Sequence, residues 1–311
     1  MKRQANPQLT PTGEEALTQY EQTLQNREDL TPASIRNYLS DLHHFLAWYE
    51  TCLVTGSDEP LSHRPFDLQM ITTPALTRYR AYLQKDQRQK PASVNRALIS
   101  FKRYFAWAMQ NHRMTYDPSA TVKLVGQEET PPRHLDDEEE QALVAAVTKT
   151  GTLRDRVLIV LLLHTGLRAQ EICQLRKDQV KLGKRSGFLE VIGKRNKYRE
   201  VPLNTTARKV LEEYLSSIHT ESIFLFPSGK TKKALSERAL GYIVKKYACG
   251  AKLSDVSPHD LQHRFGYRMA ESVPLHRLAQ IMGHDSLDTT KLSIQGTKHD
   301  VQQDVDTIAW T

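Results

Sequence analysis

The apolar residues in the first part of the chain recur at steps of three and four, the spacing that places side chains on one face of an α-helix. The clearest pattern follows Thr31 and Pro32, a capping residue and a proline suited to the first helical position. Its apolar stripe comprises Ile35, Tyr38, Leu39, Leu42, Phe45, Leu46 and Tyr49. Arg36 and Asn37 fall on the other side of this predicted helix.

A second such helix begins near Pro91, and weaker periodicity predicts helices over residues 14–24 and 74–83. Residues 10–115 are therefore predicted to form one all-helical domain. The polar positions of the Pro91 helix that we expect to be exposed are Asn95, Arg96, Lys102 and Arg103. With Arg36 and Asn37, these residues suit contacts with a phosphate backbone, although a solvated helix face explains the same pattern.

The helical periodicity of apolar residues stops at residues 116–134, which contain a double proline and no apolar repeat. This pattern predicts a linker. Residues 135–311 form the second predicted domain, which mixes helices with two short strands at 188–192 and 198–202. The basic turn 193–197 between these strands predicts a hairpin with cations at its tip. The predicted helices begin near Leu135, Leu153 and Gly166, and others cover residues 206–218, 236–247, 259–271 and 275–282.

Composition adds a basic balance, since 43 Lys and Arg against 36 Asp and Glu give a net charge of +7. This charge favours a nucleic acid as the partner. Three distant cysteines support neither a disulfide framework nor a zinc site, so we expect no metal and a reducing compartment. No apolar run approaches the ~20 residues that a membrane span requires, which predicts a cytoplasmic protein.

Four short sequence motifs stand out in the second domain. They are HTGLRAQE from His164 to Glu171, GKRNK from Gly193 to Lys197, PHDLQHR from Pro258 to Arg264, and MGHDSLDTTKLS from Met282 to Ser293. In this order the four resemble the catalytic domain of the tyrosine recombinases, the family of Xer-type resolvases and of phage and transposon integrases. The resemblance extends to the whole chain, because the helical domain and the linker look like that family's SAM-like core-binding domain and hinge.

The resemblance implies a mainly α-helical fold with a small β-sheet, and a two-domain clamp on duplex DNA. In the family a tyrosine attacks the scissile phosphate and forms a 3′-phosphotyrosyl bond, without a metal or cofactor. By motif, Arg168 matches a phosphate-binding arginine and Glu171 the acid that orients the site. Lys194 matches the general acid, with Lys197 as its local rival. Fixed cations are what the charge on a transferring phosphate requires.

The third and fourth motifs carry the remaining site residues and two departures from the family pattern. His259 and His284 match the family's histidines, but Gln262 stands where the second arginine is expected and Ser293 where the tyrosine is expected. Arg264 does not replace the missing cation, because it lies about 200° around the helix from Gln262. The chain is therefore predicted to bind its site and to be defective in cleavage. Deliberate inactivation and a natural binding-only relative both explain the pattern.

The family further implies a bacterial-type protein associated with the nucleoid, particular partners and one role for the tail. These partners are double-stranded DNA with an inverted-repeat recombination site and other copies of the chain, as a dimer on each site and a tetramer in the synapse. Residues 298–311 are predicted to form a C-terminal helix, which docks either on a neighbouring protomer or on its own domain. The alternative functions are a non-catalytic regulatory DNA-binding protein, a type IB topoisomerase-like enzyme, or an unrelated helical transcription factor.

Overall fold

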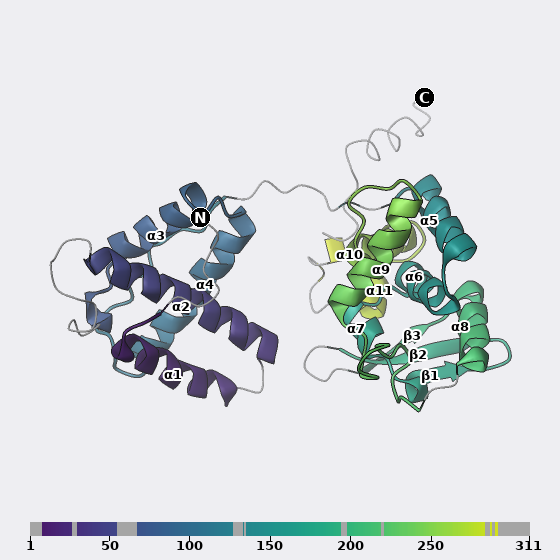
Figure 1. Ribbon diagram of the computed structural model, residues 1–311, viewed down its shortest axis with the longest axis horizontal. Coiled ribbons are helices and arrows are strands. Elements are labelled where there is room, and N and C mark those ends of the chain that lie inside the picture. Colours follow the sequence, from purple (N-terminus) through teal and green to yellow (C-terminus); the bar gives the residue numbers. More distant parts are fainter. Residues whose placement is uncertain are drawn as a thin grey trace, which may run out of the picture. The chain divides into compact units, whose positions relative to one another are not determined.

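The computed structural model describes residues 8–26, 30–54, 67–126, 133, 135–193, 198–218, 221–283, 287 and 290–291. The chain divides into two compact units, Met1–Glu129 and Thr130–Thr311. Figure 1 shows the helices of the first unit and the mixed elements of the second. The predictions for Lys194, Lys197, His284, Ser293 and residues 298–311 concern residues outside the described ranges.

The described residues of the N-terminal unit form four helices, α1 (Pro11–Gln25), α2 (Pro32–Val54), α3 (Thr73–Lys85) and α4 (Pro91–Gln110), and a short 3-10 turn, η2 (Leu68–Met70). Threonine side chains begin three of the helices: Thr10, Thr31 and Thr72 each accept a hydrogen bond from a backbone N–H three residues later. Helix α2 packs on both α1 and α4. The four helices predicted from periodicity are all present.

The apolar stripes of these helices meet in a core rich in aromatic rings. Phe45 and Phe101 lie with their ring centroids 5.0 Å apart, as do Trp48 and Tyr79, and Tyr20 meets the edge of Tyr104 at 5.1 Å. Such offset and edge-on arrangements stabilise a core beyond the area that they bury. The stripe read from the sequence of α2 is thus the face that enters this core.

The segment after α4, which was predicted to be linker, is fixed to the N-terminal unit as far as residue 126. The Tyr116 hydroxyl donates a hydrogen bond to the Ile71 carbonyl at 2.6 Å, and Lys102 Nζ donates to the Ser119 carbonyl at 2.6 Å. The Asn95 amide exchanges two hydrogen bonds with the backbone of Val125, at 2.9 and 2.7 Å. Asn95 was expected to be exposed, and this expectation is wrong because the returning segment covers it.

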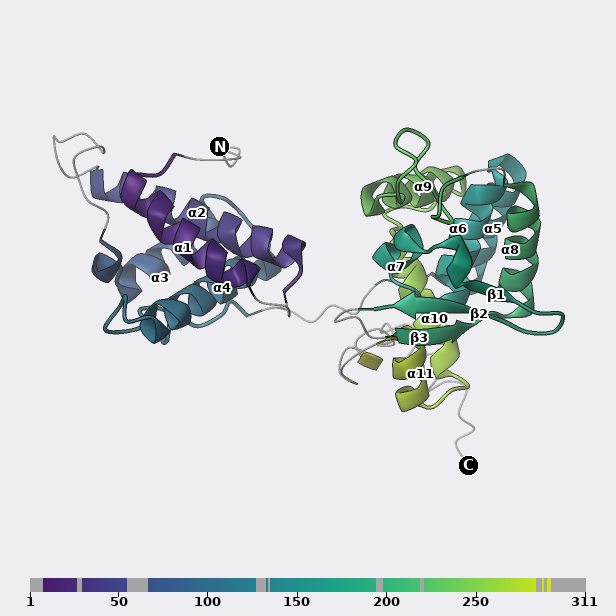
Figure 2. The same cartoon turned by 90° about the horizontal axis from the view of Figure 1, so that it is seen from below.

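The C-terminal unit contains a three-stranded antiparallel sheet in the order β1 (Val180–Leu182), β2 (Gly187–Ile192), β3 (Tyr198–Pro202). The predicted hairpin is confirmed by the pairing of Phe188 with Pro202 and of Ile192 with Tyr198. Strand β1 was not predicted, because three residues are too short to show an alternation. Figure 2 shows the sheet with α11 beside β3, a contact that the coordinates also give.

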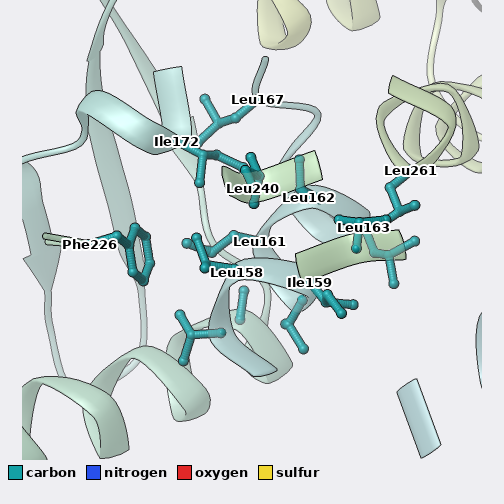
Figure 3. Close-up of a cluster of buried hydrophobic side chains, with 14 of the residues drawn as sticks. Leu158, Ile159, Leu161, Leu162, Leu163, Leu167, Ile172, Phe226, Leu240 and Leu261 are labelled. Atoms are coloured by element: carbon teal, nitrogen blue, oxygen red, sulfur yellow. The ribbon is translucent and has the colours of Figure 1, made fainter. Parts of the chain in front are cut away.

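Seven helices surround this sheet among the described residues: α5 (Asp137–Thr150), α6 (Leu153–Thr165), α7 (Ala169–Gln174), α8 (Thr205–Ser217), α9 (Glu237–Gly250), α10 (Pro258–Ala270) and α11 (Leu275–Met282); a 3-10 turn, η3 (Lys177–Gln179), precedes β1. Helix α6 is the centre of the core, since every residue from Val157 to Leu163 is buried. Figure 3 shows its leucines against Phe226, Leu240 and Leu261 from later parts of the chain. The chain is mainly helical with one small sheet, as predicted.

Candidate functional site

Arg168 stands at a sharp turn between the buried helix α6 and the short helix α7. Gly166 ends α6 in a left-handed conformation, with φ +64°, which glycine adopts without strain. A Cβ at this position would lie 2.5 Å from the Phe265 ring, so the turn also needs a glycine for space. The turn brings Arg168 to the N-cap position directly before α7, with 38% of its side chain exposed.

The Arg168 guanidinium is held by one group that is near in the sequence and by one that is far away. Its Nη2 donates a hydrogen bond to the Gly283 carbonyl at 2.9 Å, and its Nη1 donates to Glu171 Oε1 at 3.3 Å. The backbone N–H of Arg168 also donates to Glu171 Oε2, at 2.8 Å. Arg168 is thus oriented while part of its guanidinium still faces solvent, where an anion has access.

Glu171 is buried, with 7% of its side chain exposed, and it binds a second arginine, Arg199 on β3. Arg199 Nη1 and Nη2 donate to the two carboxylate oxygens at 2.8 and 2.9 Å. Burial alone raises the pKa of Glu171, but the hydrogen bonds and charge of Arg199, assisted by Arg168, hold it below its ordinary value. Glu171 is therefore a carboxylate at neutral pH.

Sequence reasoning did not select Arg199, although a signal for it was present. Alternation along β3 places Arg199 on the same face as Val201, which is fully buried. An arginine at an inward-facing strand position must find a carboxylate or carbonyl partner, because an unpaired buried charge is very unfavourable. The inward position thus indicated a charged partner without identifying Glu171.

Helix α10 brings His259 and Gln262 to the same turn. Gln262 is buried, with 6% exposed, and its Nε2 donates to the Gly166 carbonyl at 3.0 Å. His259 Nδ1 lies 3.3 Å from Gln262 Oε1, and the His259 ring lies 4.1 Å from that of His263. The structure therefore places Gln262 beside the turn that carries Arg168, and at this position it supplies a neutral amide.

Arg264 lies on another side of α10 and has a structural role. Its Nε donates to Glu140 Oε2 at 2.7 Å, and its Nη2 is bonded to Asp137. Arg268 Nη1 donates to the same Glu140 carboxylate at 3.0 and 3.2 Å. These pairs fasten α10 to α5, and they leave Arg264, with 6% of its side chain exposed, directed away from Arg168.

The residues of the N-terminal unit predicted to contact DNA separate into two groups. Arg36, Asn37 and Arg103 are exposed, and the Arg103 guanidinium lies 5.1 Å from the centre of the Tyr38 ring. Arg96 is exposed too, but it donates at 2.8 Å to the buried Asp41. Asn95 and Lys102 are engaged with the returning segment. The first group is therefore better placed to meet an external phosphate.

The described residues also limit the kind of site that they can form. Within them, no group of three or more His, Cys, Asp or Glu side chains is arranged to hold a metal ion. Across the same residues, each helix is either too short or too polar to traverse a lipid bilayer. The described residues of the candidate site are Arg168, Glu171, Arg199, His259 and Gln262.

Comparison with known proteins gives matches over both units. The model of the phage integrase family matches residues 133–297, and that of the phage integrase N-terminal SAM-like domain matches residues 17–112. Tyrosine recombinase XerD of Listeria innocua is 27% identical over 282 residues, covering 86% of this chain and 90% of that protein. XerD of Ralstonia nicotianae is 28% identical over 297 residues, covering 91% and 90%.

Solved structures share the fold at lower identity. XerH site-specific recombinase bound to a palindromic difH substrate has a TM-score of 0.70 and 19% identity, with 99% of each chain covered. A λ integrase dimer bound to a core site has a TM-score of 0.69 and 15% identity, with 91% of this chain and 95% of that chain covered. The family model spans more than half of the sequence, and this chain therefore belongs to the phage integrase family of tyrosine recombinases.

Proposed function

We propose that this chain occupies recombination sites as a DNA-binding tyrosine recombinase that does not itself cleave DNA. The family carries out site-specific recombination, in which mobile elements are integrated, excised or resolved. The observation that carries the proposal is the placement of Gln262 beside the Arg168 turn, with its amide donating to Gly166. The position that adjoins the phosphate-binding arginine thus brings no second positive charge.

A missing cation has a large effect on phosphoryl transfer. The equatorial oxygens of the phosphate gain charge in the transition state, and preorganised donors stabilise that charge. Loss of one such donor commonly lowers the rate on the order of 10²- to 10³-fold. Arg168 remains, but one of its contacts is already directed at Glu171. The site therefore suits binding of a ground-state phosphate better than stabilisation of the transition state.

The sequence supplies the second argument, at the position of the nucleophile. Ser293 follows His284 by nine residues, where the family places its tyrosine, and no tyrosine follows Tyr267. A phenol with a pKa near 10 is easier to deprotonate than an aliphatic hydroxyl and is a better leaving group when the intermediate reverses. Ser293 is thus a poor replacement for a tyrosine that must attack and later leave.

Binding itself is retained in this proposal. The partner is double-stranded DNA with an inverted-repeat site, which a dimer occupies and a tetramer synapses. Solved structures of λ integrase include a dimer bound to a core site and a tetramer bound to a Holliday junction. Exposed Arg36, Asn37 and Arg103 are the candidate phosphate contacts of the N-terminal unit, and Lys194 and Lys197 those of the hairpin.

The test begins with selection of bound duplexes from a random pool by the unaltered chain. A nicked suicide form of the selected duplex is then incubated with the unaltered chain, with Gln262→Arg, with Ser293→Tyr and with the double variant. On denaturing gels we expect a covalent adduct from the double variant and none from the unaltered chain. The single variant Ser293→Tyr should form the adduct at least about 10²-fold more slowly than the double variant, because it lacks the cationic donor at position 262.

The controls separate a lost site from a lost fold. Arg168→Ala added to the double variant should abolish the adduct while the duplex still binds through its other contacts. An adduct formed by the unaltered chain would overturn the claim of inactivity. If the unaltered chain enriches no duplex from the pool, the claim of DNA binding fails.

A further inference from the structure

We propose that Arg199 is a positioning residue that neutralises Glu171 and thereby keeps the charge of Arg168 available for a DNA phosphate. This inference rests on the proposed DNA binding at the Arg168 site. It assigns to a residue of β3 a function that it performs through its neighbours, without contacting the DNA. The contacts of its guanidinium carry the first step.

Every nitrogen of the Arg199 guanidinium donates to the protein. Nη1 and Nη2 form the parallel pair of bonds with the Glu171 carboxylate, and Nε donates to the Ile281 carbonyl at 3.1 Å. Only 13% of the side chain is exposed. A guanidinium held in this way is strongly oriented, since the planar fork matches both carboxylate oxygens. Arg199 is thus engaged inside the protein and not by an external anion.

The end of α11 is shaped around Arg199. Gly283 follows α11 with φ +65°, and a Cβ there would lie 2.6 Å from Cζ and from Nη1 of Arg199. The missing side chain therefore lets the guanidinium pass directly against the backbone. The Gly283 carbonyl then accepts from Arg168, while the Ile281 carbonyl accepts from Arg199. Both arginines cap the carbonyl end of α11, where positive charge is favoured.

The two arginines share Glu171 unequally. Arg199 makes two bonds to its oxygens, at 2.8 and 2.9 Å, whereas the Arg168 side chain makes one, at 3.3 Å. The Arg168 side chain is also the more exposed, at 38% against 13%. The single negative charge of Glu171 is therefore met mainly by Arg199. The positive charge of Arg168 is left to attract an anion from solvent.

Removal of Arg199 should reverse this distribution. Glu171 would stay buried with Arg168 as its remaining cation, and a buried carboxylate strongly favours a paired cation over none. Arg168 would then turn toward Glu171 and give up its phosphate contact. A plot of log K for DNA binding against log salt concentration has a negative slope, and each lost phosphate contact makes this slope shallower by about 0.9 for duplex DNA. The DNA-binding slope is thus a readout that a merely weakened fold does not move by this amount.

The experiment measures the affinity for the selected duplex over a series of salt concentrations. The variants are Arg168→Met, Arg199→Met, Arg199→Lys and the double variant Arg199→Met with Glu171→Gln. We expect the slope to fall by about one unit for Arg168→Met and for Arg199→Met. It should stay near that of the unaltered chain for Arg199→Lys, which keeps a cation beside Glu171. It should recover in the double variant, because no carboxylate remains to capture Arg168.

A matched control removes an arginine from another carboxylate pair. Arg176 donates through Nε and Nη2 to the two oxygens of the exposed Asp178, at 3.1 and 2.9 Å. Arg176→Met should leave the slope unchanged, although it alters the net charge as Arg199→Met does. Carbon-13 detection of the Glu171 carboxyl provides a readout without DNA. Its titration midpoint should move upward in Arg199→Met and move less in Arg199→Lys.

The outcomes distinguish this inference from the proposed function. A slope unchanged by Arg168→Met would remove the phosphate site and, with it, the role assigned to Arg199. A slope lowered by Arg168→Met but not by Arg199→Met would overturn the positioning role alone. Failure of Glu171→Gln to restore the slope in a folded double variant would also overturn it, because the effect would then not pass through the carboxylate.

Discussion

The two units of this chain are stabilised by different means. The N-terminal unit packs aromatic rings from α1 to α4, and its buried acids Asp41 and Glu50 are met by Arg96 and by Thr10. The C-terminal unit has a mainly aliphatic core around α6, and it also buries Arg264. Apolar packing thus dominates the first unit, in which Arg96 of the Arg96–Asp41 pair stays exposed, whereas the second unit buries both partners of the Arg264–Glu140 pair.

Polar contacts in both units join residues that are far apart in the sequence, over 55 positions for Arg96 and Asp41 and over 40 for Thr10 and Glu50 in the first unit. The pairs of the C-terminal unit join residues far apart: Arg199 to Glu171 over 28 positions, Arg168 to Gly283 over 115 and Arg264 to Glu140 over 124. Such pairs fix the position of a charge, which an apolar stripe does not do. The proposed presentation of Arg168 to a phosphate depends on this kind of constraint.

The largest effect that tests the comparison is expected from Glu140→Gln. This change leaves Arg264 buried beside an amide, with the exposed Asp137 as its remaining carboxylate partner, and removal of one partner of a buried ion pair lowers the free energy of unfolding by about 3–5 kcal/mol. The loss should be confined to the C-terminal unit, as hydrogen exchange resolved by segment would show. Glu138→Gln, at an exposed position of the same helix, is the control. A loss below about 1 kcal/mol, the level of a surface pair, would contradict the role of the pair.

In the N-terminal unit the corresponding change is Leu98→Ala. Leu98 is 2% exposed within the aromatic core, and truncation of a buried leucine costs about 3 kcal/mol. Hydrogen exchange should accelerate in α1 to α4 and stay unchanged in the C-terminal unit. The adjacent Ile99 is 41% exposed, so Ile99→Ala should change the stability by less than about 1 kcal/mol. Equal effects at the two positions would show that the core is not where the stripe places it.

The same contrast explains how far the sequence predicts this molecule. The helices of the first unit follow from local periodicity, because the residues that pack are three and four positions apart. The helix predicted to begin near Gly166 is present too, as α7, and Gly166 adopts the left-handed conformation that glycine favours. These elements depend on neighbouring residues alone. The motifs also predicted that Arg168, Glu171, His259 and Gln262 share one site, and Gln262 lies beside the turn that carries Arg168.

What the sequence did not reveal depends on contacts between distant residues. Arg199 lies within the short strand 198–202, and nothing nearby shows that Glu171 is its partner. Asn95 was read as exposed because its helix alone leaves it uncovered. The return of residues 121–126 over α4 buries it, and a segment without apolar period gives no sign of this packing. The predicted linker was too long at its start for the same reason.

A smaller effect is expected from Asn95→Ala. The side chain satisfies both backbone groups of Val125, and loss of a buried hydrogen-bonding partner costs about 1–2 kcal/mol. Hydrogen exchange should accelerate in residues 121–126, while the salt dependence of DNA binding stays unchanged. Asn37→Ala, at an exposed position of α2, should leave exchange in that segment unaltered. A decrease of the salt slope with Asn95→Ala would instead favour the phosphate contact predicted from sequence.

The smallest effect is confined to acid and concerns Glu171. Its folded-state pKa lies below the ordinary value of 4.5 because Arg199 and Arg168 outweigh the opposing effect of burial, so the unfolded chain binds its proton first as the pH falls. The stability that the carboxylate contributes is therefore complete above about pH 4.5 and is lost as the pH falls through the folded-state value. Denaturation midpoints of the unaltered chain and of Glu171→Gln should differ at neutral pH and converge in this acid window.

His164 supplies a second pH window for comparison, because burial lowers its pKa below 6.5 and the stability of the fold then falls as the pH drops under that value. His164→Gln should remove the change near pH 6 and leave the Glu171 window in place. A difference between the unaltered chain and Glu171→Gln that stays constant down to the lowest pH would show that the charge of Glu171 contributes nothing to holding the two arginines.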